Sequence, residues 1–131
     1  MTAPNPPNAL RVGADIAERL LDFGAQALGL ANQLPRTDIG RHVALQVARA
    51  ATSAGANYEE ARAAESARDF AHKAAVAAKE MREAAYWIRM IARSGLFSGN
   101  VAGILHEAGE LSAVLGACVR TARKRESQSL R

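Results

Sequence analysis

Acidic residues and histidines at helical spacing are the first residues in this chain that could do chemistry. Three groups have that spacing: Asp69-x-x-His72, Glu80-x-x-Glu83, and His106-Glu107 with Glu110 nearby. Bundles that hold two iron ions take a Glu-x-x-His motif from each of two helices and a further glutamate from each of the other two. The groups present do not make two matching half-sites, so we expect no metal ion.

Nucleophilic catalysis has little support in the residue pattern. His42, His72 and His106 fall on different predicted helices, and their positions give no Ser-His-Asp or Cys-His arrangement. Cys118 is the only cysteine, which excludes an intramolecular disulfide and a multi-cysteine zinc site, and we expect a buried thiol. No glycine-rich phosphate loop follows a strand. We therefore expect no enzymatic activity, no cofactor and no small-molecule substrate.

Lysine and arginine residues give the chain a formal net charge of +4 and suggest a second kind of function. The candidate nucleic-acid-binding residues are Arg41, Arg49, Arg62, Arg68, Lys73, Arg120, Arg123, Lys124 and Arg125. Several chains around an axis would multiply such clusters into a positive surface that releases counterions from a phosphate backbone. Interleaved aromatic residues that stack on single-stranded bases are absent. Binding to RNA or DNA would be sequence-tolerant and salt-sensitive; the alternative is that the charges only keep the protein soluble.

One polar arc on the second predicted helix is a further candidate surface. It contains His42, Gln46, Arg49, Ser53 and Glu60 within about 60°, opposite an apolar stripe. A solvated face is one interpretation, and a subunit contact or ligand surface is the other. Arg49 is of most interest, because a guanidinium group can pair bidentately with a carboxylate or a phosphate.

Composition and pattern both favour helices as the elements that position these residues. Hydrophobic residues make up 49% of the 131 residues and aromatic residues only 5%, so alanine and leucine must do most of the packing. Strand-forming runs are absent, and proline occurs only in the first seven residues and at Pro35. We expect helices from about residue 9 to just before Pro35, from the N-cap Thr37 to about residue 64, from the N-cap Ser66 to the C-cap Gly95, and from about residue 101 to 125. The prediction is an all-α, antiparallel up-down-up-down four-helix bundle over residues 9–125, with a flexible leader at 1–8 and a flexible tail at 126–131.

The third predicted helix has two stripes rather than one. Its core stripe consists of Phe70, Ala74, Ala77, Met81, Ala84, Ile88 and Ala92. A second stripe, offset by about 130°, consists of Val76, Glu80, Glu83, Trp87 and Met90. A helix with two such sides has two neighbours, and we expect the second neighbour to be another copy of the chain. Trp87 is the expected anchor of this homo-oligomer interface; the alternative is a partly exposed core position.

Two motifs on the second and third predicted helices resemble a known family. The first motif is Arg49-Ala50-Ala51-Thr52-Ser53 with Asn57-Tyr58-Glu59-Glu60-Ala61, and the second runs from Lys79-Glu80 to Tyr86-Trp87-Ile88 after Ser66 and Asp69-Phe70. They are similar to those of the bacterial four-helix-bundle family named for proteins encoded in 23S rRNA intervening sequences. The resemblance covers roughly residues 15–120. It departs from the pattern at Glu60-Ala61, where many members have glutamate-glycine and a bend that depends on the glycine.

The resemblance implies an antiparallel four-helix bundle that assembles as a ring, commonly a homopentamer. The family also looks related to the accessory variability determinant of diversity-generating retroelements, a basic pentameric barrel thought to bind nucleic acid and reverse transcriptase. For most members no activity is established.

The sequence as a whole therefore favours a non-enzymatic homo-oligomer that offers a basic surface to nucleic acid or to a nucleic-acid enzyme. The alternative is a protein-interaction module with no nucleic-acid role, whose partner is a helix laid in a groove. The chain shows no secretory signal and no uninterrupted run of about 18 apolar residues, so we expect a cytoplasmic protein with no membrane partner.

Overall fold

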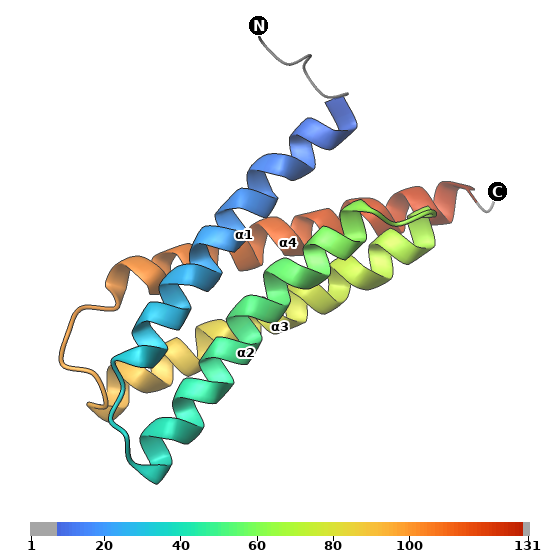
Figure 1. Ribbon diagram of the computed structural model, residues 1–131. Coiled ribbons are helices and arrows are strands. Elements are labelled where there is room, and N and C mark those ends of the chain that lie inside the picture. The colour runs from blue at the N-terminus through green and yellow to red at the C-terminus, as the bar shows by residue number, and fades with distance from the viewer. Residues whose placement is uncertain (1–7, 130–131) are drawn as a thin grey trace, which may run out of the picture.

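The computed structural model describes residues 8–129, which form four helices with short connections (Figure 1). The helices are α1 (Asn8–Asn32), α2 (Asp38–Arg62), α3 (Ala67–Ser94) and α4 (Ala102–Ser129). The all-α four-helix bundle predicted from the sequence is confirmed. The helix α1 begins one residue earlier than expected, and α4 continues to Ser129, past the expected boundary at residue 125. The predicted leader, apart from residue 8, and the last two residues of the predicted tail lie outside the described residues.

The helix ends follow the capping signals in the sequence. Thr37 Oγ1 accepts a hydrogen bond from the Gly40 amide at 3.1 Å, and Ser66 Oγ accepts one from the Asp69 amide at 3.0 Å. Each bond satisfies one of the amides that lack a partner in the first turn of a helix. Gly95 ends α3 in the left-handed conformation, with a φ of 74°, which an L residue rarely adopts. All three predicted caps are confirmed.

One glycine in the first turn of α2 is required by close packing. A Cβ atom added to Gly40 would overlap the carbonyl oxygen of Pro35. The chain turns so tightly between Leu34 and α2 that the backbone of one segment occupies the space of a side chain on the other. A smaller residue than alanine is therefore needed at position 40.

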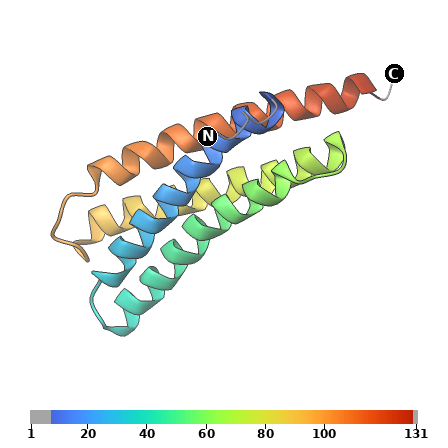
Figure 2. The same cartoon turned by 45° about the horizontal axis from the view of Figure 1, so that its top comes forward.

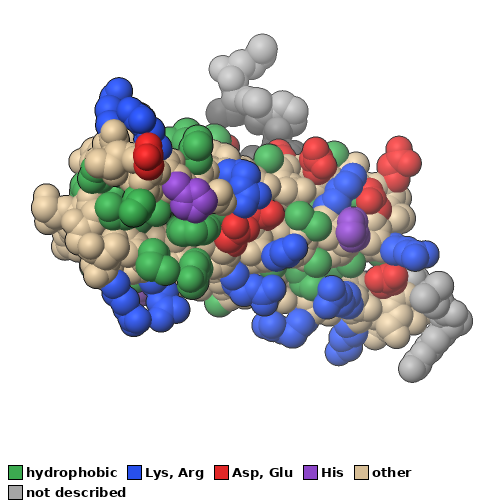
Figure 3. Space-filling view, turned by 90° about the horizontal axis from the view of Figure 1, so that it is seen from below, with side chains coloured by type: hydrophobic (Ala, Val, Ile, Leu, Met, Phe, Trp, Pro, Cys, Tyr) green, Lys and Arg blue, Asp and Glu red, His purple; other side chains and the backbone are tan. Residues whose placement is uncertain are grey.

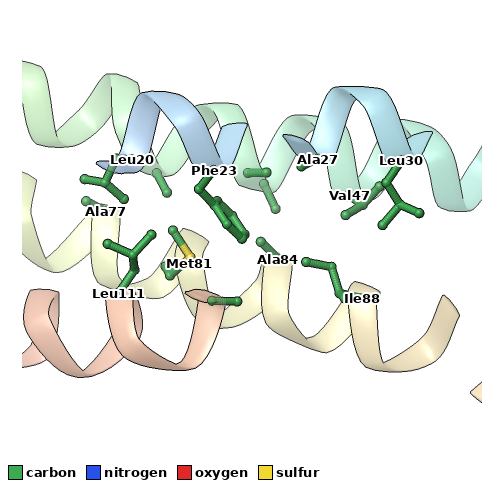
Figure 4. Packing of buried hydrophobic residues seen from close by; sticks show 14 of the residues in the cluster. Leu20, Phe23, Ala27, Leu30, Val47, Ala77, Met81, Ala84, Ile88 and Leu111 are labelled. Carbon is green, nitrogen blue, oxygen red and sulfur yellow. The ribbon is translucent and has the colours of Figure 1, made fainter. Parts of the chain in front are cut away.

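The core lies between all four helices (Figure 4). Phe23 of α1 points toward Met81 and Ala84 of α3, and Leu20 lies beside Ala77. Leu111 of α4 lies on the other side of this cluster. Phe23 and Met81 have no exposed surface. The buried stripe of α3 differs from the expected one at its end, because Ile91 is fully buried and Ala92 is exposed. Phe70, at the other end of that stripe, is only partly buried.

The helices α2 and α3 run antiparallel, as two pairs of contacts show. Arg49 of α2 meets Glu83 of α3, and His42, earlier in α2, meets Trp87, later in α3. Both views show α2 and α3 side by side, whereas α1 leaves α2 toward its own N-terminal end (Figures 1 and 2). A second small cluster of buried residues joins α2, α3 and α4 at the end of the bundle where α2 connects to α3 (Figure 1). It consists of Ala61, Ala74 and Val119.

One of the described helices is long and apolar enough, by length and composition alone, to cross a membrane. The segment Ala102–Gln128 of α4 has a mean hydropathy of 1.2 over its most apolar window, and 22% of that window is buried. Its leucines at 111 and 115 are fully buried against the other helices. A single helix of this length and composition is weak evidence for a membrane span, and no described helix is strongly membrane-like.

Candidate nucleic-acid and assembly surfaces

The two sequence motifs meet along the contact between α2 and α3, which we call the α2–α3 seam (His42, Gln46 and Arg49 of α2; Glu83 and Trp87 of α3). Arg49 Nη2 donates to Glu83 Oε1 at 3.0 Å and to Gln46 Oε1 at 3.1 Å. The side chain of Arg49 is 59% exposed and that of Glu83 is 32% exposed, so solvent screens this ion pair. The guanidinium group of Arg49 is thus engaged by a carboxylate of its own chain.

Trp87 lies in the same seam with aromatic neighbours on two sides. Its ring meets the His42 ring edge-on at a centroid distance of 5.9 Å and the Tyr86 ring at 5.6 Å. Edge-to-face geometry at these distances is favourable for aromatic pairs. Trp87 Nε1 and Glu80 Oε2 are buried and have no hydrogen-bond partner among the described residues. Within α2, the Ser53 hydroxyl accepts a hydrogen bond from Asn57 at 3.0 Å.

The residues predicted to form an oligomer interface are now placed, although the interface itself stays a prediction. Val76, Glu80, Glu83 and Trp87 are partly buried, and Met90 is 38% exposed. Glu83 and Trp87 have partners on α2 of the same chain. Met90 therefore has the most open position of the five. It lies beside Tyr86, which is 53% exposed, and the exposed Arg89 and Arg93.

Seven of the nine predicted nucleic-acid-binding residues lie at one end of the bundle, which we call the basic end: Arg62, Arg68, Lys73, Arg120, Arg123, Lys124 and Arg125. The second cluster of buried residues explains this gathering, because it packs the end of α2 and the start of α3 against the last turns of α4. Arg62 pairs with Glu59 at 3.0 Å and Lys73 with Asp69 at 3.2 Å. The other five cations form no ion pair with any residue whose side chain is described. Arg41 and Arg49 lie elsewhere on α2.

A further line of exposed residues on α3, made of three arginines and a tyrosine, was not singled out from the sequence. Arg82, Tyr86, Arg89 and Arg93 follow one another at intervals of four, three and four residues, and all are exposed. This spacing places them on one face of the helix. Figure 3 shows Lys and Arg side chains gathered along the lower edge of the molecule in that view. The spacing alone could have revealed this face.

A groove lies between α1 and α2. Its volume is about 580 Å³, and it is lined mainly by apolar and small residues, among them Leu21, Ala25 and Leu28 of α1 and Thr52 and Ala56 of α2. Leu21 is 65% exposed and Leu28 is 46% exposed. Glu18, Glu59 and Arg62 line the groove as well, and Arg62 forms an ion pair with Glu59. Sequence reasoning missed this groove.

Tyr58 of α2 and Cys118 of α4 both have raised pKa values. Burial raises the pKa of Tyr58 to about 12, and the nearby Cys118 acts in the same direction. Burial also raises the pKa of the Cys118 thiol, so the thiolate is disfavoured, although the side chain is half-buried rather than fully buried as expected. Within the described part of the chain, no group of three His, Cys, Asp or Glu residues could hold a metal ion.

Comparisons with known proteins agree with the four-helix fold. The chain is similar to a crystal structure of a protein of unknown function from the S23 ribosomal protein family of Bacteroides thetaiotaomicron, with 26% identity and a TM-score of 0.74. The similarity covers 82% of this chain and 97% of that one. No curated protein is significantly similar to the chain in sequence. The family model of the 23S rRNA-intervening sequence protein matches residues 14–117, and the chain therefore belongs to this family.

Proposed function

We propose that this protein is a non-enzymatic, cytoplasmic homo-oligomer that binds nucleic acid, or a nucleic-acid enzyme together with its nucleic acid, through the basic end. The gathering of seven cations from three helices at that end is the observation that carries the proposal. The family resemblance adds the form of the assembly, a ring that is commonly a pentamer.

The basic end is suited to phosphate groups rather than to a single carboxylate ligand. Arg68, Arg120, Arg123, Lys124 and Arg125 form no ion pair with residues of described side chain, so their charges are available to an outside partner. Arginine and lysine side chains on the outside of helices can follow a phosphate backbone without reading its bases. Each phosphate neutralised releases condensed counterions, which makes binding weaken steeply as salt rises.

Assembly strengthens nucleic-acid binding because every copy of the chain carries a basic end. Each copy adds the same cluster, so an oligomer presents several basic ends to one polyanion and gains avidity without new kinds of contact. A single copy carries a net charge of only +4 and would bind weakly.

The histidines support the non-enzymatic part of the proposal. His42 lies against Trp87, His106 lies 3.3 Å from Glu110 on the exposed face of α4, and His72 is exposed on α3. These three positions are on three different helices, and no described contact joins any of them to a serine, threonine or cysteine that could act as a nucleophile.

A titration with labelled RNA and DNA of mixed sequence tests the proposal. The wild-type protein is expected to bind both, with an affinity that falls as salt rises. The double variant Arg120→Glu/Arg123→Glu should bind at least about tenfold more weakly and show a smaller salt slope, by about 0.9 for each phosphate that the protein no longer neutralises. Arg36→Glu, which reverses one charge at the opposite end, is the control and should change affinity little.

The opposite outcome favours the alternative function. Absence of salt-dependent binding to either nucleic acid would leave a protein-interaction module, and the groove between α1 and α2 is the observation that favours such a role.

A further inference from the structure

We propose that the groove between α1 and α2 of one copy receives the exposed edge of α3 from a second copy. This edge, called here the α3 edge, consists of Tyr86, Arg89, Met90 and Arg93. The inference rests on the self-association included in the proposed function and assigns the two surfaces that meet.

The groove has an apolar surface that its own chain leaves uncovered. Leu21 and Leu28 stand on the α1 wall with 65% and 46% of their surface exposed. Ala25 lies between them on the same face, and Thr52 and Ala56 form the α2 wall. Covering such residues is favourable by about 25 cal/mol for each Å² of apolar surface removed from water.

The charges on α1 and around the groove indicate which kind of surface fits there. From residue 13 to 32, α1 carries three acids, Asp15, Glu18 and Asp22, and a single base, Arg19. Arg19 is held by Glu107 and Glu110 of α4, so it does not neutralise the groove side of α1. Glu18, Glu59 and Arg62 line the groove itself, and because Arg62 pairs with Glu59, Glu18 is the acid of the lining that is left for a partner. A partner that fits here is apolar at its centre and positive where it meets Glu18.

The α3 edge has this composition. Tyr86 and Met90 are one turn apart and exposed, and they supply the apolar centre. Arg89 and Arg93 flank them, and neither forms an ion pair with the part of the chain whose side chains are described. The two cations can therefore approach Glu18 on α1 of a neighbour without giving up a partner of their own.

The two surfaces also match in length. Leu21 and Leu28 are seven residues apart, as are Tyr86 and Arg93, and seven residues of helix span about 10.5 Å. A helix edge laid along the groove would therefore bring two turns of α3 against two turns of α1. This is the ordinary way in which one helix packs into the space between two others.

The proposed contact uses different surfaces on its two sides. In a pair of copies, one groove and one α3 edge remain unoccupied, so further copies can add until a ring closes. An isologous contact, in which the same patch faces itself, would stop at two copies. This difference makes the inference testable by mixing two variants.

The experiment uses Leu21→Arg, which places a cation in the groove, and Met90→Glu, which places an acid on the α3 edge. Both residues are exposed in the single chain, so the variants should keep the helical circular dichroism and unfolding midpoint of the wild type. Alone, each should have the mass of one chain, 13.9 kDa, in light scattering. Mixed in equal amounts, they should form a dimer of twice this mass, because the first retains an intact α3 edge and the second an intact groove. Leu45→Arg changes a leucine that is 70% exposed and outside the groove, and it should keep the wild-type mass.

Each other result overturns the inference in a distinguishable way. An oligomeric wild type whose mass is unchanged by Leu21→Arg and Met90→Glu would show that copies meet elsewhere, and self-association would stand. Variants that are single chains but do not associate when mixed would also contradict the pairing of these two surfaces. A wild type that is a single chain at all concentrations would overturn self-association itself. Nucleic-acid titration of the single-chain variants then tests the basic end separately.

Discussion

Arg49 of α2 and Glu83 of α3 form an ion pair across the α2–α3 seam, with 3.0 Å between Nη2 and Oε1. The two residues belong to the two motifs that identify the family. The motifs therefore contact each other within one chain, across α2 and α3.

The Arg49–Glu83 pair should contribute little to stability on its own. Both side chains are partly exposed, and ion pairs of this kind are worth about 0.2 to 1 kcal/mol. A double-mutant cycle with Arg49→Ala and Glu83→Ala in urea unfolding measures this coupling directly. Repeating the cycle at high salt should reduce the coupling, and a coupling of several kcal/mol would contradict the solvent-screened geometry.

The contact between Trp87 and His42 should be visible in fluorescence. Trp87 is the only tryptophan, so its emission reports this site alone. His42→Ala removes the edge-on ring and should shift the emission to longer wavelength and cost about 0.5 to 1.5 kcal/mol. His72→Ala, which removes an exposed histidine elsewhere on α3, is the control. Equal spectra for both variants and the wild type would show that the ring contact is not made in solution.

Two glycines should respond to alanine in opposite directions. Gly40→Ala places a Cβ atom against the carbonyl oxygen of Pro35, and overpacking of this kind costs about 1 to 3 kcal/mol. Gly109→Ala, on α4, meets no atom within 4 Å and should stabilise the helix by about 0.5 to 1 kcal/mol. Thermal unfolding of the two variants measures both effects. The tight connection before α2 would be disproved if Gly40→Ala were as stable as the wild type.

Burial of Tyr58 should make the fold sensitive to alkali. Its pKa is about 12 in the folded chain and 10.0 in the reference state, so the unfolded chain loses the phenol proton first. The contribution is therefore fully present below pH 10 and falls as pH rises from 10 to about 12. Tyr58→Phe should weaken this alkaline loss of stability. In a Tyr86→Phe background Tyr58 is the only tyrosine, and an absorbance titration of its phenolate should give a midpoint well above pH 10.

The helices and their ends could be predicted because the signals are local. Thr37, Ser66 and Gly95 specify caps through their own chemistry, and alanine and leucine at helical spacing specify the buried faces. Gly40 could not be assigned in this way, because the overlap it avoids involves Pro35, five residues away across a turn. Ile91 is buried where Ala92 was expected, because the buried face of α3 shifts around the helix axis near its C-terminal end.

The surfaces were predictable only in part, for a related reason. The spacing of Glu83 and Trp87 gave the direction of a second stripe on α3, but it could not say which helix lies in that direction. The structure places α2 of the same chain there. The basic end follows from antiparallel topology, which brings the end of α2, the start of α3 and the end of α4 together. The groove depends on how α1 diverges from α2, which no periodicity encodes.

The small second cluster of buried residues, formed by Ala61, Ala74 and Val119, has a consequence for how the bundle moves. Alanines contribute little apolar area, so this end has less to lose by opening than the region around Phe23. Its backbone amides should therefore exchange with deuterium through local openings that need less free energy than global unfolding. A bound polyanion would slow that exchange by neutralising the repulsion among the cations there, so protection at this end would report occupancy residue by residue.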